Sequence, residues 1–550
     1  MKTSIKISRA ISLKCLGHSL ILVAFTVLGT LSQAASAKDS PKEALKAPAQ
    51  ELARLARVLA PRPSAEQTIF IEILNSEQLE KALFQWPSAF EESAVGATPS
   101  GEALGALLNY HNGLRVYALE SLLTIEQPEK IHAELRSVWK RTVPENAYEW
   151  SLINAKLWRS QWKTVFGQGV ESRVRSHEVF QAGQERELQE LLKKAPEGTP
   201  ERVWLEWQSV LISAVAANSD NSAAAKKLAA LMSTSQAMKP PPVSMDLMNL
   251  TAARLLYQAG YLEAAKKYYE RVSKTSDDWF DAQEELAWTE LRKGEAQNAL
   301  AITRSLVIPA FLPLISPEAV FAKSLAHLKV CDYPEVAKAL HLFRDTFKER
   351  SRVLMALSDS GNTPSVDAFI GRMKANRRLQ MTDLGAEAAK LPRFVARDEV
   401  LTRAIQLDRE FEAESSKFKD LYGRSVTGGT AKVGFQGRLE QVRRELDTRA
   451  RAARSAVYLR IKALAREELD EISQVLTKMH IVEAELLQQV AMSDRVVKST
   501  EGTAVSEKKG TTGSRDRDRV VFPDDGETWF DEVSNYQVDL KKGCQVGKKQ

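Results

Sequence analysis

Histidine is the side chain that most often binds zinc or transfers protons near neutral pH, so its spacing is the first test for chemistry. The chain has seven histidines, at positions 18, 111, 132, 177, 327, 341 and 480. None has the His-x-x-x-His spacing that would place two imidazoles on one face of a helix. We expect His327 and His341 to be ordinary surface or groove side chains, and the sequence predicts no metal site.

Two other patterns resemble catalytic motifs only in outline. Gly423–Gly428 has the outer spacing of a phosphate-binding loop, but it lacks the Gly-Lys-Ser/Thr ending and a preceding apolar strand. The acidic pairs Glu284-Glu285 and Glu467-Glu468 are adjacent in sequence, so the two members point in different directions on a helix. We interpret them as solvated faces, and the sequence predicts no catalytic residue, no cofactor and no enzyme activity.

Residues 1–37 have the pattern of a secretory signal peptide. Basic residues precede an apolar run over 20–31, which is shorter than the ~20 residues needed to span a bilayer, and Ala35-Ser36-Ala37 follows. We expect cleavage after Ala37 and a periplasmic protein with no later membrane span, the alternative being an N-terminal anchor. Cleavage removes four basic and no acidic residues, which lowers the formal net charge from +6 to +2 and disfavours nucleic acid as a partner.

Cys331 and Cys544 are the two cysteines that follow the expected cleavage site. In an oxidising compartment they are candidates for a disulfide that would join the middle of the chain to its C-terminal segment. The alternative is two free thiols.

The sequence around Cys331 repeats with a nearly fixed period, which predicts the helices that position it. Gly260 and Gly294 lie 34 residues apart, and their neighbours match in register, as in the pair Ala265 and Ala299. A third unit follows at a step of 37, with Cys331 at the glycine position and Val336 at the alanine position. Such a period predicts pairs of helices that stack and bury one another's apolar faces.

Over about residues 245–350 this pattern resembles the tetratricopeptide repeat family. The family motif has a small residue in the first helix, a glycine at the turn, a small residue early in the second helix and an aromatic residue four positions later. The first unit matches it with Ala253, Gly260, Ala265 and Tyr269. The second departs from it at Thr303, where an aromatic residue is usual.

The resemblance implies a concave protein-binding face lined by the first helices of the pairs. The corresponding positions are Arg254, Gln258, Glu284, Trp288, Arg292, Phe321, Leu325 and Lys329. Aromatic anchors and charges together suit an extended peptide. For Trp288 and Phe321, packing inside the protein is an equal alternative.

The rest of the chain is also predicted to be helical. Trp150, Trp158 and Trp162 have spacings that share one helical face, and we interpret them as packing between helices, with a surface for peptide or glycan strands as the alternative. The predicted segments are a helix and linker (38–66), a helical-repeat region (67–235), repeats (245–350), connecting helices (351–395), a long helical hairpin (396–495), a disordered linker (496–519) and a C-terminal docking segment (520–550).

The predicted fold is all-α, a tetratricopeptide-like helical-repeat solenoid followed by a long antiparallel helical hairpin. The order of segments loosely resembles periplasmic repeat proteins of the gliding and envelope machinery of deltaproteobacteria. That resemblance implies a non-catalytic scaffold for envelope proteins or peptides. The alternative is a peptidoglycan enzyme of the helical-superhelix type or its regulator, although the Glu-Ser and Gly-Leu-Met-Gln segments of such enzymes are missing.

Overall fold

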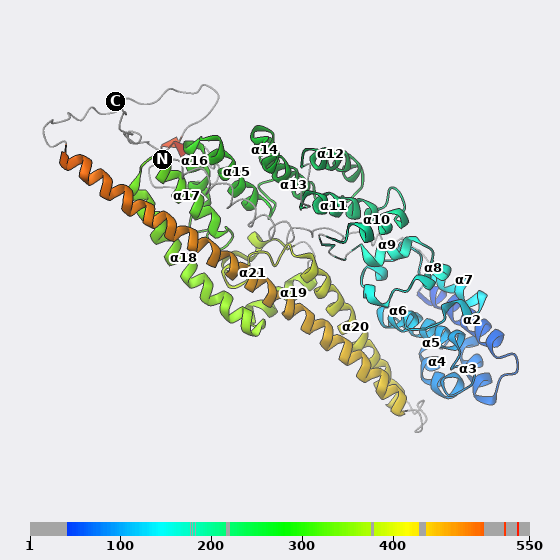
Figure 1. Cartoon of the computed structure of the whole chain (residues 1–550). Helices are drawn as coiled ribbons and strands as arrows, with labels where there is room; N and C mark the ends of the chain where they lie inside the picture. Colours follow the sequence, from blue (N-terminus) through cyan, green and yellow to red (C-terminus); the bar gives the residue numbers. More distant parts are fainter. Residues whose placement is uncertain are drawn as a thin grey trace. The chain divides into compact units, whose positions relative to one another are not determined.

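The computed structural model describes residues 41–176, 178, 180–181, 183–215, 221–375, 379–427, 436–499, 522–523 and 536–537 (Figure 1). Most of these residues are helical, which confirms the predicted all-α class for this part of the chain. The chain forms two compact units. Unit 1 consists of Met1–Ala217, Ser233–Val243 and Glu399–Val457, and unit 2 of Asn218–Met232, Ser244–Asp398 and Tyr458–Gln550.

Several predictions fall outside the described residues. They are the signal peptide, Cys15, most of the linker 496–519, and Cys544 with most of the segment 520–550. Within the described ranges, no helix combines the length and apolar character that a membrane crossing requires.

Unit 1 consists of α-helices joined by short turns. Its helices are α2 (Pro41–Leu59), α3 (Ala65–Asn75), α4 (Leu79–Trp86), α5 (Pro99–His111), α6 (Arg115–Leu123), α7 (Ala133–Thr142), α8 (Lys163–Phe166), α9 (Gly169–Arg175), α10 (Glu185–Lys194), α11 (Pro200–Val215) and α20 (Glu399–Thr427). Short π- and 3₁₀-turns lie between them: η1 (Pro87–Glu91), η2 (Pro128–Lys130), η3 (Tyr148–Ser151), η4 (Ala155–Leu157) and η5 (Ser160–Trp162). Capping fixes the start of α3, because Ser64 and Gln67 bond each other's backbone N–H groups.

The aromatic core of unit 1 corrects one prediction about its local structure. Trp150, Trp158 and Trp162 do not share a helix, since two of them lie in the separate 3₁₀-turns η3 and η5 and Trp158 directly follows η4. They are nevertheless buried, and the rings of Trp150 and Phe166 meet edge to face at 4.7 Å. Packing is confirmed, and an exposed aromatic surface for peptide or glycan strands is excluded at these positions.

Unit 2 is built mainly from helix pairs. Its helices are α13 (Met245–Gln258), α14 (Leu262–Tyr269), α15 (Trp279–Lys293), α16 (Ala296–Leu306), α17 (Pro317–Lys329), α18 (Tyr333–Ser360), α19 (Pro364–Ala375) and η6 (Met381–Lys390). Two helices contribute to both units, α12 (Asn221–Ala237) and α21 (Gln436–Ser499). Two short strands, β1 (Phe522–Pro523) and β2 (Tyr536–Gln537), pair in parallel, a feature that the sequence did not indicate.

The predicted turns at Gly260, Gly294 and Cys331 share one backbone geometry. Each residue has a positive φ, of 85°, 94° and 58° respectively. In each turn, the N–H of the next residue donates to the carbonyl five positions before it, at 2.9–3.0 Å. This is the hydrogen bond of a left-handed helix ending, and it reverses the chain into the second helix of the pair.

The same turn occurs twice in unit 1, between α3 and α4 at Glu77 and between α5 and α6 at Gly113. Five residues after each of the five turns stands a small residue with 0% exposure, namely Ala82, Ala118, Ala265, Ala299 and Val336. A side chain of this size lets the two helices of a pair approach closely. The described residues therefore contain a recurring helical-pair unit, which occurs both within 245–350 and upstream, within 67–235.

The long helices are anchored separately in each unit. In unit 1, Arg454 of α21 bonds Asp408 of α20 at 2.6 Å, and Ser415 bonds Asp447 at 2.5 Å, so the two helices run antiparallel. In unit 2, α18 runs antiparallel to the later part of α21 (Figure 1). Gly361, directly after α18, approaches the backbone of Tyr458 so closely that a Cβ there would lie 2.7 Å from its carbonyl oxygen.

Candidate partner-binding surface and its buried charge network

The eight predicted partner-binding residues, together with Leu250 at the ninth equivalent position, form three rows of three across α13, α15 and α17. We call these rows buried, middle and open. The buried row is Leu250, Glu284 and Phe321; the middle row is Arg254, Trp288 and Leu325; and the open row is Gln258, Arg292 and Lys329. Exposure increases from the buried to the open row, so one edge of the predicted surface is covered and the other is accessible.

The buried row is covered by the chain itself. Glu284 is 5% exposed and accepts hydrogen bonds from the N–H of Ser316, at 2.7 Å, and from its hydroxyl. Phe321 is 3% exposed and lies under the Lys478 ammonium of α21, 5.5 Å from the ring centroid. These side chains are therefore unavailable to a partner in this structure, and for Phe321 the internal-packing alternative holds.

The middle row is buried on α13 and becomes partly accessible on α15 and α17. Arg254 is 2% exposed, and its guanidinium bonds the Glu285 carboxylate through Nε and Nη2. Burial alone would lower the pKa of Arg254, but Glu285 and Asp281 outweigh it and raise that pKa above its ordinary value. Trp288 and Leu325 are only partly buried, and they pack on the small apolar cluster around Leu291.

The open row caps the ends of preceding helices. The Arg292 guanidinium donates to the carbonyl of Tyr257 at 2.7 Å, and Lys329 donates to the carbonyl of Leu291 at 2.7 Å. The two acceptors occupy equivalent positions in the last turns of α13 and α15, where a cation also interacts favourably with the helix dipole. Gln258 instead accepts a hydrogen bond from Asn221 at 2.8 Å.

The later part of α21 lies against α17 within unit 2. Lys478 forms an ion pair with Glu318, and the Ser324 hydroxyl contacts the Met479 sulfur at 3.7 Å. The α21 residues Val475, Met479, Val482 and Leu486 are all buried. Their spacing of three and four residues is that of an amphipathic helix placing one apolar face on a groove.

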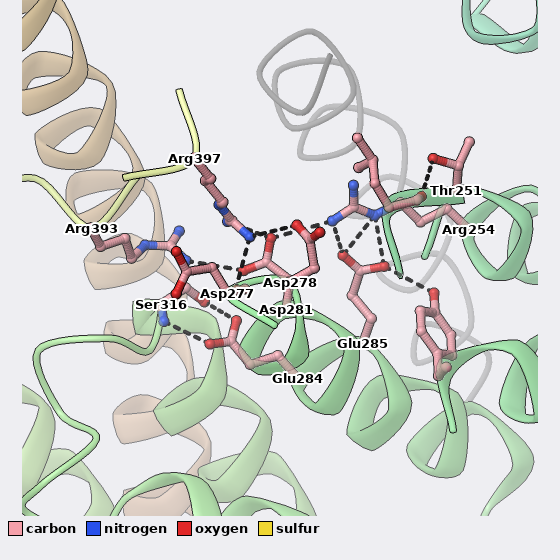
Figure 2. A network of polar contacts seen from close by, with 12 residues as sticks. Thr251, Arg254, Asp277, Asp278, Asp281, Glu284, Glu285, Ser316, Arg393 and Arg397 are labelled. Atoms are coloured by element: carbon pink, nitrogen blue, oxygen red, sulfur yellow. Dashed lines mark hydrogen bonds and ion pairs between the residues drawn. The ribbon is translucent and has the colours of Figure 1, made fainter. Parts of the chain in front are cut away.

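A buried network of charges joins α13 and α15 to the segment before α20 (Figure 2). Arg397 donates to Asp278 at 3.1 Å and to Asp281 at 2.7 Å. Arg393 bonds Asp281 at 3.4 Å and Glu471 of α21 at 2.6 Å. Asp278, Asp281 and Glu471 each form an ion pair with at least one of these guanidiniums, which offsets the cost of burying their charges.

Burial and neighbouring charges shift the acidities in this network in opposite directions. Burial raises the pKa of Glu284 to about 8, a shift that Arg393 opposes and Asp281 reinforces. Burial also tends to raise the pKa of Asp281, but Arg397, Arg393 and Arg254 overcome it and hold that pKa below its usual value. Asp281 therefore carries the negative charge at the centre of the network, next to a carboxyl group that retains its proton more readily.

Sequence reasoning missed this network and misread two of its members. The interpretation of Glu284 and Glu468 as solvated is wrong, because Glu284 bonds Ser316 and Glu468 is 3% exposed and bonded to Arg350. One signal was present in the sequence: the start of α15 holds five carboxylates, at 277, 278, 281, 284 and 285. The partners of Asp277, Asp278 and Asp281 lie more than a hundred positions away, which no local pattern indicates.

The space within the network is small and charge-balanced. A small recess is lined by Asp277, Phe280, Asp281, Leu314, Met381, Arg393 and Arg397. Its carboxylates and guanidiniums are already bonded to one another or to backbone groups. Among the described residues, no group of three or more His, Cys, Asp or Glu side chains is arranged to hold a metal ion. This arrangement fits a structural role, in which the charges hold α13, α15 and the segment before α20 together.

Comparisons of the chain with protein-family models, with curated proteins and with solved structures found no match.

Proposed function

We propose that this chain is a non-catalytic periplasmic scaffold that binds protein partners through its helical pairs, within an envelope-associated complex such as a motility machine. The observation that carries the proposal is the recurrence of one turn geometry and one buried small residue in pair after pair. Such a recurrence is what a tetratricopeptide-like solenoid would have, and arrays of that kind present extended surfaces to peptides. The helical hairpin formed by α20 and α21 belongs to the same proposal.

The partner-binding surface in this proposal is the accessible edge of the predicted face. It consists of Trp288 and Leu325 of the middle row together with the open row, Gln258, Arg292 and Lys329. Two exposed cations beside a partly buried indole favour a partner segment with carboxylates and one large apolar anchor. The covered edge supports the same idea, because there α17 already holds an amphipathic helix of the same chain.

The test is affinity capture from envelope extracts with the mature protein and a Trp288→Ala, Arg292→Ala variant. We expect the variant to lose defined partners that the unaltered protein captures, while its helical circular dichroism stays unchanged. Arg352→Ala is the matched control, since Arg352 is an exposed cation of α18 that pairs only with Glu349 within its own helix. Equal capture by all three proteins would place the partner surface elsewhere on the molecule.

A peptidoglycan digestion assay separates the scaffold from the enzyme alternative. We expect no release of muropeptides by the mature protein, alone or with divalent cations. Clear turnover that survives further purification would overturn the scaffold proposal in favour of the enzyme.

A further inference from the structure

Helix α16 is buried on more sides than its position in a helical pair explains. Its five consecutive residues Ala299–Thr303 are all buried. Five residues at 3.6 per turn extend right round a helix, so α16 is covered on its whole circumference at this level. In α14, the equivalent residues alternate between buried and accessible, as expected for the outer helix of a pair.

The amino-acid types agree with this burial. Ala301 is 4% exposed, whereas the equivalent positions of α14 and α18 hold the exposed lysines Lys267 and Lys338. A lysine is stable on an outer face because its ammonium stays in water, and a buried one would need a partner for its charge. The outer face of α16 is therefore apolar at a position where both sibling helices are charged.

The described part of the C-terminal segment contacts this helix. Strand β2 packs on α16, and it pairs with β1, so two parts of the segment 520–550 are held together there. The contact lies wholly within unit 2.

A covalent link lies close to the same place. Cys331, at the turn between α17 and α18, is disulfide-bonded. The chain has three cysteines, so its partner is Cys15 or Cys544, both outside the described residues. Cys544 follows β2 by seven residues, which can span about 25 Å when extended, and α17 packs directly on α16.

We propose that the segment 520–550 is an intramolecular cover for the outer face of α16, fastened by a disulfide between Cys331 and Cys544. Forming this disulfide removes one proton and one electron from each thiol and joins the two sulfur atoms. A disulfide-bearing thiol oxidant in the compartment that receives the exported protein takes up the two electrons and two protons and becomes a dithiol. The occupant of this face is thus the chain's own C-terminal segment and not a second protein.

The first test is peptide mapping of the mature, freshly isolated protein by non-reducing mass spectrometry. Trypsin is expected to release peptide 330–338 joined to peptide 543–548, and reduction should separate them. Limited cleavage at the basic residues of 508–519 should leave the C-terminal fragment attached on a non-reducing gel. Free thiols, a link to Cys15, or a dimer linked through Cys544 would each overturn the proposal.

The second test asks whether the segment covers α16, with the rate of disulfide reduction as the readout. An Ala301→Lys substitution places a charge under the segment, and the lysines of α14 and α18 show that a helical pair accepts it there. We expect dithiothreitol to reduce the disulfide on the order of tenfold faster in this variant, because the cover opens more often. Lys338→Ala is the matched control and should leave the rate unchanged. Equal rates in Ala301→Lys and the unaltered protein would show that α16 is not the covered face.

Discussion

Arg350 of α18 and Glu468 of α21 lie 118 positions apart in the chain and form a buried, two-pronged ion pair, with Nε and Nη2 at 2.7 and 3.0 Å from the two carboxylate oxygens. The same guanidinium donates to the carbonyls of Ala389 and Leu391. One side chain thus joins the last repeat helix, the long helix and the segment between η6 and α20. All of these contacts lie within unit 2.

Replacing Arg350 by alanine should strongly destabilise unit 2. The substitution leaves the Glu468 carboxylate buried with one remaining donor, the N–H of Arg393, and losing one partner of a buried pair costs about 3–5 kcal/mol. The measurement is urea unfolding combined with hydrogen exchange over α17, α18 and α21. Arg352→Ala, which breaks an exposed pair on the same helix, should cost less than about 0.5 kcal/mol. Similar effects of the two substitutions would contradict the proposed role of the buried pair.

Two glycines with positive φ should respond differently to alanine. Gly294 has open space around it, so Gly294→Ala costs only backbone strain, about 1–2 kcal/mol. At Gly361, an added Cβ also meets the Tyr458 carbonyl oxygen and the Lys462 side chain, each at 2.7 Å, which adds roughly 1–3 kcal/mol of overpacking. Thermal unfolding should therefore give a lower transition temperature for Gly361→Ala than for Gly294→Ala. The reverse order would show that α18 does not approach α21 this closely.

Unit 2 should become less stable as the pH rises, because Glu284 then loses its proton. Its folded pKa, about 8, lies above its ordinary value of 4.5 because the site is buried. Its contribution is therefore fully present below pH 4.5 and is lost as the pH rises from there through 8. A Glu284→Gln variant keeps the shape and the bonds to Ser316 without the titration. Urea midpoints measured between pH 5 and 8 should fall more steeply in the unaltered protein than in the variant, and parallel curves would refute the assignment.

Enlarging the small residue inside a helical pair should separate packing from surface effects. Ala265 is 0% exposed between α13 and α14, so Ala265→Leu should cost about 1–3 kcal/mol through overpacking. The neighbouring Ala264 is only partly buried, and Ala264→Leu should change stability by less than half as much. The free energy of unfolding measures both, and a larger loss at 264 would mean that the helix faces are assigned wrongly.

The features predicted from sequence are those that depend on neighbours in the chain. Gly260, Gly294 and Cys331 stand at helix endings that require positive φ, and Ala265 and Ala299 stand where two helices touch. These requirements act within one helical pair, so a fixed period makes them visible. The spacing alone also located the turn at Cys331, although a cysteine is unusual in that conformation.

The features that sequence did not predict depend on contacts between distant segments. The acids of α15 looked like a solvated face because Arg393 and Arg397, which neutralise Asp281, follow more than a hundred residues later. The indoles at 150 and 158 matched a helical spacing, but the chain there forms separate 3₁₀-turns around a shared aromatic core. Periodicity identifies the apolar residues in such a region without fixing the path of the backbone.

The capping of one helix by the next gives the repeat block a direction. Arg292 of α15 completes the end of α13, and Lys329 of α17 completes the end of α15, while each cation comes from the later helix. Shortening the array from its C-terminal side therefore removes a cap from a helix that stays behind. Shortening it from the N-terminal side removes capped carbonyls and leaves the caps of the remaining helices in place, so with respect to capping the tolerance to truncation should be asymmetric along the chain.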